Sequence, residues 1–543
     1  MRLFWGCAFA ASFAIANTAA ARQLATPPAH AGAASQMAPA LSAEVGRVSF
    51  VSGKVLFRGL GEIAWSDAAV NDPVSAGAGL RTDPAARAEI RIGADTIDLA
   101  RGTEISVAGL DDSTAEIAIA HGRIDLDVPL LGAGESIAVD FPRGRLHILQ
   151  PGRYDVDAGS DDQPPRIAAY TGGARLVEDG SGTPLKAGDA LVESGADMAH
   201  AVIEPATADD FARWCGARAI ALSKLAAPYF VSTAMTGFAA LDAAGHWRKD
   251  LEFGEVWVPD NLPAGWAPFR DGHWRWVPPW GWTWIDGLPW GFATSHYGRW
   301  VFAGRRWAWI PGRFRALPVY APAVVAFLGT AGVGLSYAGG PGPAIAWFPL
   351  APGEAYWPSY TADIDAIRAL NLGDIADLGV IRVRSDGEPP FAIAAAHFAN
   401  RLFASVVPRP VFVAGEAVAP SVLKLPPRRL QNAPAILGSP RIGPPPPPAM
   451  PVAVAAVTHG STHPHPPAPR QKALAAKRAA WARTVRAAML RVRIYRHSLL
   501  VRAAHLRLPG YAALRLRHTI VLRVAGPVRL RHPAEGRRKE FAR

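Results

Sequence analysis

The chain has 543 residues, of which 50% are hydrophobic, with 52 Gly, 49 Pro and a formal net charge of +12. This apolar content can bury a core and excludes a wholly disordered protein. The abundance of Gly and Pro disfavours a helical protein and favours strands, turns and linkers. The positive charge points to an anionic partner such as nucleic acid only if it is spread along the chain.

Residues 1–21 are predicted to be a cleavable signal peptide, because Arg2 precedes the apolar run Leu3–Ala16 and Ala19–Ala21 has an A-x-A cleavage pattern. The run of about 14 residues is shorter than the ~20 that span a membrane, although an uncleaved anchor is the alternative. We therefore expect the protein in the periplasm or cell envelope. Cleavage would remove Cys7 and leave Cys215 alone, so no internal disulfide is expected.

Residues 22–43 consist mainly of Ala, Pro, Gln and Ser and are predicted to be a disordered tether. Over residues 44–203 short runs alternate between apolar and polar side chains, as in Ala88–Ile92 and Arg123–Val128, with Gly, Asp and Pro between them. Period-two alternation at this spacing predicts an antiparallel β-sandwich or roll.

The same segment contains a series of short motifs, among them Gly46-Arg-Val, Gly53-Lys-Val, Arg87-Ala-Glu89, Pro151-Gly-Arg-Tyr154 and Gly172-Gly-Ala174. In this order, over about residues 44–195, the motifs resemble those of a FecR-like periplasmic domain. The best-known family members signal to a sigma factor through a cytoplasmic segment and a transmembrane helix. A predicted signal peptide takes that place here, so the resemblance implies only the periplasmic β-module.

A helix is predicted over about Ala208–Ala227, at the start of a second domain of residues 208–420. Asp209 and Asp210 would cap it, and an apolar stripe that includes Phe211 and Trp214 would pack against the protein. Cys215 lies on this helix with no nearby His in the sequence, so a buried inert thiol is expected.

Twelve of the 18 tryptophans lie between Gly245 and Gly312, in repeated aromatic runs that each end in Pro. Residues two apart share one face of a strand, so we expect rows of indole rings in a meandering β domain rich in Trp, Pro and Gly. The favoured interpretation is that the rings pack as a core; the alternative is an open platform that stacks on sugars. The candidate stacking residues are Trp274, Trp276, Trp280, Trp282, Trp284, Trp300, Trp307 and Trp309.

The run Trp276–Trp284, with Pro289-Trp-Gly291 and His296–Trp300, is similar to a Trp-rich domain of unknown function that is commonly found after FecR-like domains in Gram-negative envelope proteins. The similarity covers about residues 208–420. It implies a β architecture and an envelope location, and it supplies no catalytic residues.

Signatures of catalysis are sparse. Gly334–Ala338 departs from a nucleophile elbow at its fifth position, and no phosphate-binding or calcium-binding loop occurs. His246, His273 and His296 fall among the tryptophans, where polar strand edges are a simpler explanation than a shared metal site. We therefore expect no enzyme activity, no cofactor and no metal.

Residues 421–470 are predicted to be a Pro-rich linker, and residues 471–543 an Arg-rich tail. Of the chain's 57 Lys and Arg, 24 lie after residue 420, with only 2 of its 45 acids, so residues 1–420 carry a net charge of −10. The tail is interpreted either as a basic helix on an anionic membrane surface, as a solvated disordered segment, or as an extension read out of frame. Candidate anion-binding residues are Arg483, Arg486, Arg491, Arg493, Arg496 and Arg502.

Together these features predict a mainly β protein: a sandwich or roll, a Trp-rich β domain, a linker and a basic tail. The favoured function is an exported, non-enzymatic interaction or scaffold protein of the cell envelope. A glycan- or peptidoglycan-binding module and a FecR-type signalling component are the alternatives. The partner would be an envelope protein or a glycan, and nucleic acid is not expected because the excess positive charge is confined to the tail.

Overall fold

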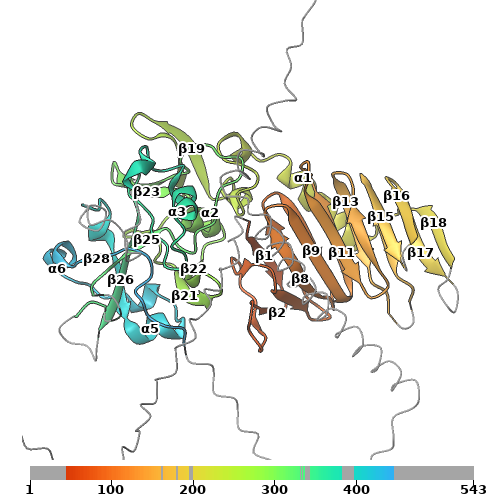
Figure 1. Cartoon of the computed structure of the whole chain (residues 1–543), viewed down its shortest axis with the longest axis horizontal. Helices are drawn as coiled ribbons and strands as arrows, with labels where there is room; N and C mark the ends of the chain where they lie inside the picture. Colours follow the sequence, from red (N-terminus) through yellow and green to blue (C-terminus); the bar gives the residue numbers. More distant parts are fainter. Residues whose placement is uncertain are drawn as a thin grey trace, which may run out of the picture. The chain divides into compact units, whose positions relative to one another are not determined.

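The computed structural model describes residues 44–445 except 161–162, 179–180, 195–199, 331, 333, 337–342 and 382–396. The predicted signal peptide, the tether, the Arg-rich tail and the second half of the Pro-rich linker lie outside the described residues. The described part is mainly β, as predicted (Figure 1). Among the described residues no helix is both long and apolar enough to cross a membrane.

Two nine-stranded sheets form the first domain, which we call the β-domain. One sheet contains, in spatial order, β18 (His200–Pro205), β17 (Asp189–Ser194), β14 (Arg166–Ala169), β13 (Gly152–Asp157), β10 (Arg123–Val128), β7 (Asp95–Leu99), β6 (Arg87–Ile92), β1 (Gly46–Ser52) and β4 (Pro73–Val74). The other contains β16 (Ser181–Lys186), β15 (Gly173–Glu178), β12 (Gly144–Ile148), β11 (Ser136–Phe141), β9 (Thr114–His121), β8 (Glu104–Asp111), β5 (Gly79–Thr82), β2 (Val55–Arg58) and β3 (Ser66–Asp67).

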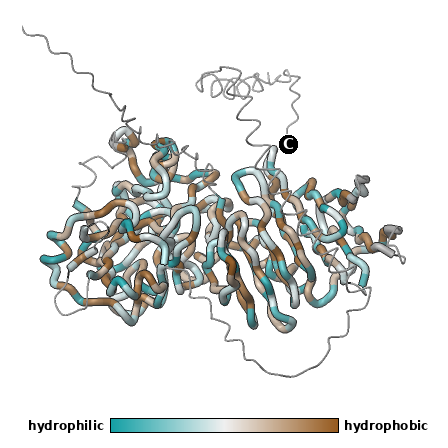
Figure 2. Tube along the Cα trace, turned by 60° about the horizontal axis from the view of Figure 1, so that its bottom comes forward, coloured by the Kyte–Doolittle hydropathy of each residue, from teal (hydrophilic) through white to brown (hydrophobic). Residues whose placement is uncertain are grey.

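The core of the β-domain lies between these sheets, because alternate residues of each strand point inward. Along β10, Ile124, Leu126 and Val128 join one continuous cluster of buried Val, Ile, Leu and Ala side chains. Figure 2 shows the resulting recurrence of hydrophobic residues within the strands. The pairings are antiparallel except that of β9 with β11, so the predicted antiparallel sandwich or roll is confirmed with one parallel exception.

The motif residues Tyr154 and Gly172 form a buried corner. The Tyr154 hydroxyl donates to the carbonyl of Gln150 at 2.6 Å and accepts from the backbone N–H of Gly173 at 2.9 Å. Gly172 has a φ of +82°, and a Cβ there would collide with the hydroxyl. The spacing of these residues is therefore explained by packing.

Helix α1 (Asp210–Leu222) follows the β-domain, and the Asp209 side chain caps it by accepting from the N–H of Ala212. The helix buries Phe211, Ala212 and Cys215, as expected for a packing face. It is shorter than the predicted span because the chain leaves the helix at Ser223.

The Trp-rich domain contains two four-stranded sheets and a separate hairpin. The first sheet has the order β19 (Gly245–Asp250), β20 (Gly254–Pro259), β24 (Arg306–Ile310), β23 (Arg299–Ala303). The hairpin consists of β21 (Gly272–Val277) and β22 (Gly281–Asp286). The second sheet has the order β27 (Ser405–Pro408), β26 (Ala344–Pro349), β25 (Val325–Leu328), β28 (Ala435–Ile436). Its helices are α2 (Gly291–His296), α3 (Ile364–Asn371), α5 (Arg409–Ala414) and α6 (Pro427–Asn432), with 3-10 turns η1 (Ala227–Tyr229), η2 (Phe238–Ala240), η3 (Leu378–Val380), η4 (Arg401–Phe403) and η5 (Ala419–Ser421).

The fold extends beyond residue 420, where the linker was predicted to begin. Strand β28 pairs with β25, and Leu430 and Ala433 belong to the core of the second sheet. The predicted boundary at residue 421 is therefore too early.

Polar contacts join the β-domain to the hairpin β21–β22. The side chain of Asn71 donates to the carbonyls of Asp286 at 2.9 Å and Leu288 at 2.8 Å. Arg275 of β21 forms ion pairs with Asp72 at 3.0 Å and Glu62 at 2.9 Å. The charge on Arg275 is therefore neutralised at this contact.

Candidate aromatic binding site

Seven of the eight candidate stacking tryptophans are buried. All except Trp276 are at most 5% exposed. The hairpin places Trp274 opposite Trp284 and Trp276 opposite Trp282, as the alternation predicts. Trp274 and Trp284 meet edge to face, with ring centroids 5.6 Å apart. The interpretation of the rings as a core is therefore correct for these seven, and their burial excludes an open stacking platform built from them.

Most of the buried indole N–H groups in this set have acceptors inside the protein. Trp284 donates to the carboxylate of Asp286 at 2.8 Å, Trp300 to the carbonyl of Thr294 at 2.9 Å, and Trp309 to that of Tyr297 at 2.9 Å. Buried polar groups are costly without such partners. These hydrogen bonds fix the orientation of each ring, as a structural core requires.

Trp276 is the exception, because its ring is only partly buried. It packs edge to face on Trp282, with centroids 5.7 Å apart, and lines an open groove of about 630 Å³. We call this the aromatic groove and define it by its lining residues Trp276, Trp280, Trp357, Tyr360, Leu437, Ser439, Arg441, Ile442 and Gly443. Its volume falls in the range of small-ligand sites.

The lining of the aromatic groove combines aromatic rings and prolines with polar groups. Ser359, Thr361 and Ser439 bring hydroxyl groups, and Arg441 brings the one guanidinium among its lining residues. Trp357 and Tyr360 come from the loop before α3, far from Trp276 in the sequence. This combination suits a ligand with flat apolar faces and hydroxyl groups.

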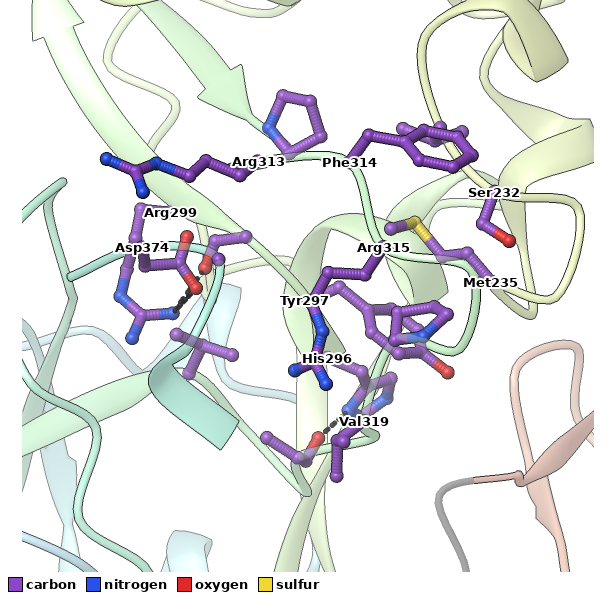
Figure 3. A pocket seen from close by; sticks show the side chains of 18 of the residues that line it. Ser232, Met235, His296, Tyr297, Arg299, Arg313, Phe314, Arg315, Val319 and Asp374 are labelled. Carbon is purple, nitrogen blue, oxygen red and sulfur yellow. Dashed lines mark hydrogen bonds and ion pairs between the residues drawn. The ribbon is translucent and has the colours of Figure 1, made fainter. Parts of the chain in front are cut away.

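A second cavity, shown in Figure 3, is small. It encloses about 50 Å³ and is lined by His296, Arg299, Arg315 and Asp374 among others. Arg299 forms an ion pair with Asp374 at 3.1 Å. The Nδ1 atom of His296 hydrogen-bonds the carbonyl of Ala321 at 2.7 Å, and burial lowers the pKa of His296 to about 3. The imidazole is therefore neutral at physiological pH.

The structure does not bring the candidate histidines together as metal ligands. His246 pairs with Asp260 at 2.8 Å, whereas His296 is buried against Tyr320. Within the described residues, the cluster with metal-ligand geometry is instead Asp98, Asp125 and Cys215. That cluster belongs to a larger charged network.

Four carboxylates lie side by side across the outer face of one sheet of the β-domain. Glu89 of β6 is opposite Asp98 of β7, Asp98 is opposite Asp125 of β10, and Asp125 is opposite Asp155 of β13. All four are at most 3% exposed. We call this row the acid ladder. Like charges directly opposite one another destabilise a sheet, so the ladder needs compensating groups.

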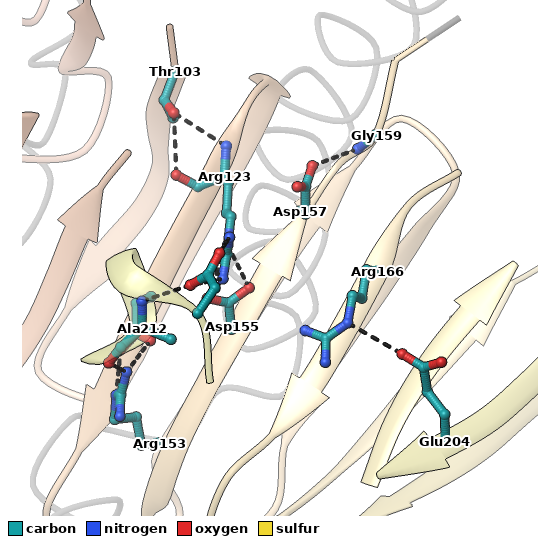
Figure 4. A network of polar contacts seen from close by, with 11 residues as sticks. Thr103, Arg123, Arg153, Asp155, Asp157, Gly159, Arg166, Glu204 and Ala212 are labelled. Carbon is teal, nitrogen blue, oxygen red and sulfur yellow. Dashed lines mark hydrogen bonds and ion pairs between the residues drawn. The ribbon is translucent and has the colours of Figure 1, made fainter. Parts of the chain in front are cut away.

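Arginines neutralise three of the four carboxylates, and Figure 4 shows one of these pairs, Arg123 with Asp155. Arg153 binds Asp125 through two hydrogen bonds of 2.8 Å, and it also donates to the carbonyl of Ala212 in α1. Arg123 binds Asp155 at 2.8 Å and also contacts the capping residue Asp209. The carboxylate of Glu89 is paired with Arg91 and Arg218, at the far end of the row.

Asp98 has no arginine partner among the described residues, and one of its oxygens accepts no hydrogen bond there. Burial, together with the charges of Glu89 and Asp125, raises the pKa of Asp98 to about 8. Both oxygens of Asp125 already accept from Arg153, and burial raises the pKa of the Cys215 thiol. The cluster is therefore best described as a protonated Asp98 beside a thiol.

Replacing Asp98 by Asn should change how stability depends on pH. The folded state holds a proton on Asp98 between pH ~4 and about 8, whereas the unfolded state does not, so wild-type stability falls as pH rises through that window. Asn keeps the shape without the titration. Between pH 5 and pH 9 the wild type should lose roughly 2 °C or more of melting temperature relative to the variant. The exposed control Asp67→Asn should follow the wild type, and parallel curves for wild type and Asp98→Asn would contradict the assignment.

The acid ladder and the groove residues Trp357 and Arg441 were not predicted from the sequence. In Ile97-Asp-Leu99 and Ile124-Asp-Leu126 the acids occupy what alternation marks as the solvent face. Their recurrence on neighbouring strands was the available signal. The predicted anion-binding arginines between Arg483 and Arg502 lie outside the described residues.

Comparisons with known proteins cover part of the chain. Residues 238–354 match a family of unknown function (DUF6600). No curated protein matches. Two crystal structures of a protein from Parabacteroides distasonis ATCC 8503, assigned as an anti-sigma factor, are similar at 13% and 12% identity. Each match covers 25% of this chain and 63% or 64% of the other chain, with a TM-score of 0.23, which is too low to carry an argument. The Trp-rich segment therefore resembles a family whose function is unknown.

Proposed function

We propose that the protein is an exported, non-enzymatic component of the cell envelope that binds a glycan in the aromatic groove. The observation that carries the proposal is the partly exposed ring of Trp276, which lines an open groove with Trp357 and Tyr360. Sugars present apolar C–H faces that stack on aromatic rings, and their hydroxyl groups match the serines and Arg441 beside them. The predicted signal peptide supports the envelope location.

The Trp276→Ala variant should lose glycan binding while remaining folded. Trp276 is partly exposed, so its removal deletes a ligand contact and little of the core. Binding of the full chain to insoluble peptidoglycan and to neutral oligosaccharides, measured by pull-down and calorimetry, should fall at least about tenfold, since one stacked ring contributes on the order of 1.4 kcal/mol.

The matched control is Trp65→Ala. Trp65 is also partly exposed, but it lies in the β-domain beneath Arg58 and Arg81. This variant should bind as the wild type does. Equal binding by Trp276→Ala and wild type would contradict the proposal, as would a wild-type chain that binds none of these glycans.

An envelope protein is the second candidate for the partner. The observation that favours it is the edge strand β18, which among the described strands pairs with β17 alone and exposes Val202 and Ile203. An open edge can accept a strand from a partner. If the wild-type chain bound no glycan in any assay, binding to an envelope protein would be the better proposal for its function. That function would be an interaction or scaffold role, which includes FecR-type signalling.

A further inference from the structure

A second groove lies on the Trp-rich domain, and it shares no residue with the aromatic groove. It is open and has a volume of about 520 Å³, and its lining combines the segment Val258–Ala267 with aromatic and arginine side chains from other parts of the domain. We call it the arginine groove. Its defining residues are Trp266, Arg270, Phe302, Arg305, Arg306, Trp307 and Phe403.

The turn between β23 and β24 builds one side of this groove. Gly304 and Arg305 both have positive φ, at +58° and +63°, which reverses the chain between Phe302 and Trp307, a cross-strand pair. The turn leaves Arg305 and Arg306 exposed. It also leaves Phe302 39% exposed, which is unusual in a domain that buries most of its rings.

Three rings in contact form the apolar surface of the groove. Phe302 lies 4.6 Å from Phe403 and 5.2 Å from Trp307, measured between centroids, and Trp307 lies 5.0 Å from Phe403. Trp266 lines the same groove, and its buried indole N–H has no acceptor among the described residues. The groove therefore offers an apolar face and an excess of hydrogen-bond donors.

The charge of the groove is positive. Arg305 and Arg306 form no ion pair with the described residues. Arg270 donates to the carbonyl of Gly265 at 2.8 Å and has Asp271 beside it in the sequence. The one acid that lines the groove, Asp260, is paired with His246. A ligand must therefore bring acceptors with negative charge.

We propose that the arginine groove binds an acidic polysaccharide, with a sugar face stacked on Phe302 and Phe403 and its carboxylates bound by Arg305 and Arg306. Guanidinium groups match carboxylates through paired hydrogen bonds, and the stacked rings select a pyranose face over a simple anion. The proposal rests on glycan binding as the proposed function and adds a second site with a defined charge.

The test compares two ligands that differ only in charge. The full chain is titrated with polygalacturonate oligomers and with the same oligomers as methyl esters, which keep the ring faces and lose the carboxylates. We expect at least about tenfold tighter binding of the acidic form at low salt, because each carboxylate gains charge-assisted hydrogen bonds. Equal binding of the two forms would overturn the proposal.

Variants then locate the site. Arg305→Glu with Arg306→Glu should weaken polygalacturonate binding at least about tenfold. The matched control, Arg248→Glu with Lys249→Glu, makes the same change in net charge on exposed residues of β19 in the same sheet, and it should change binding less than threefold. Phe302→Ala removes a stacking ring without changing charge and should also weaken binding. Equal loss in the matched control would indicate a general charge effect and would contradict a specific site.

Two further outcomes separate this inference from the proposed function. Trp276→Ala should retain polygalacturonate binding, because the grooves share no residue; loss in that variant would place the acidic ligand in the aromatic groove and overturn the inference. Aromatic rings with arginines can also bind single-stranded nucleic acid. An oligonucleotide that binds the groove more tightly than polygalacturonate would therefore also overturn it.

Discussion

Replacing Trp284 by alanine is expected to unfold the Trp-rich domain under conditions in which the wild type is stable. Trp284 is fully buried and contacts Trp274, Trp347 and Phe269, with centroid distances from 5.6 to 6.2 Å. Removing a buried ring of this size costs about 3–5 kcal/mol through lost contacts and the cavity left behind. Typical domains have a total stability of only ~5–15 kcal/mol, so a large share of the margin would be lost.

The polar end of Trp284 adds to this cost. Its N–H donates to Asp286, a buried carboxylate that also accepts from the N–H of Leu288 at 2.9 Å and from the hydroxyl of Ser295 at 3.3 Å. Burial raises the pKa of Asp286 to about 6 and these donors oppose the shift. Loss of the indole donor leaves a buried carboxylate with fewer partners, which is unfavourable.

Urea unfolding followed by near-ultraviolet circular dichroism would measure the effect of Trp284→Ala. The Trp284→Phe variant keeps part of the buried ring and loses the N–H donor with the rest of the indole, so its midpoint should lie between those of the wild type and the alanine variant. Trp65→Ala, outside the cluster, should lose much less. If Trp284→Ala unfolds at the same urea concentration as Trp65→Ala, the cluster does not hold the domain together.

The strands of this protein were predictable because they rest on local alternation. Trp274 and Trp276 lie two residues apart on β21, as the alternation predicts, and they are opposite Trp284 and Trp282 of β22. The end of the fold was not predictable in this way. Strand β28 has only two residues, and it is defined by pairing with β25, about 100 residues earlier.

Which aromatic ring stays exposed could not be predicted, because distant segments decide it. Trp274 is covered by Trp347 and Phe412, and the indole N–H of Trp282 binds the carbonyl of Ile442. Trp276 lies on the same strand and keeps an open side. Two tryptophans that lie two residues apart on one strand thus differ in burial, and the sequence near them carries no signal for this difference.

The acid ladder shows the same limitation. Asp98 and Asp125 follow the polar half of an alternating pattern, which normally indicates the solvent face. In the structure both are buried, beside Cys215 of α1. Only the fold reveals that this face is covered, that arginines are therefore required, and that one acid remains without an arginine.

Removing Arg153 from the acid ladder is expected to be the most damaging single change in the β-domain. Asp125 is 1% exposed, and both of its oxygens accept from Arg153. Breaking a buried ion pair from one side costs about 3–5 kcal/mol, because the remaining charge is uncompensated. Arg153 also donates to the carbonyl of Ala212, so Arg153→Ala should loosen α1 from the sheet as well.

The cost of Arg153→Ala should depend on pH in a defined direction. Burial raises the pKa of Asp125, and Arg153 opposes that shift; without Arg153 the pKa rises further. A carboxyl with a raised pKa in the folded state is destabilising when the pH is high enough to ionise it. The free energy of unfolding of Arg153→Ala should therefore lie closer to the wild-type value at pH 5 than at pH 8.

Two further variants test whether the buried pair itself is responsible. Arg166→Ala breaks a more exposed pair with Glu204, at 3.5 Å, and should cost no more than ~1 kcal/mol. In the double variant Arg153→Ala with Asp125→Asn, the unpaired charge is gone, so much of the lost stability should return. Recovery at pH 8 would show that the arginine serves to neutralise Asp125. A double variant as unstable as Arg153→Ala would mean instead that the main contribution of Arg153 is its contact with α1.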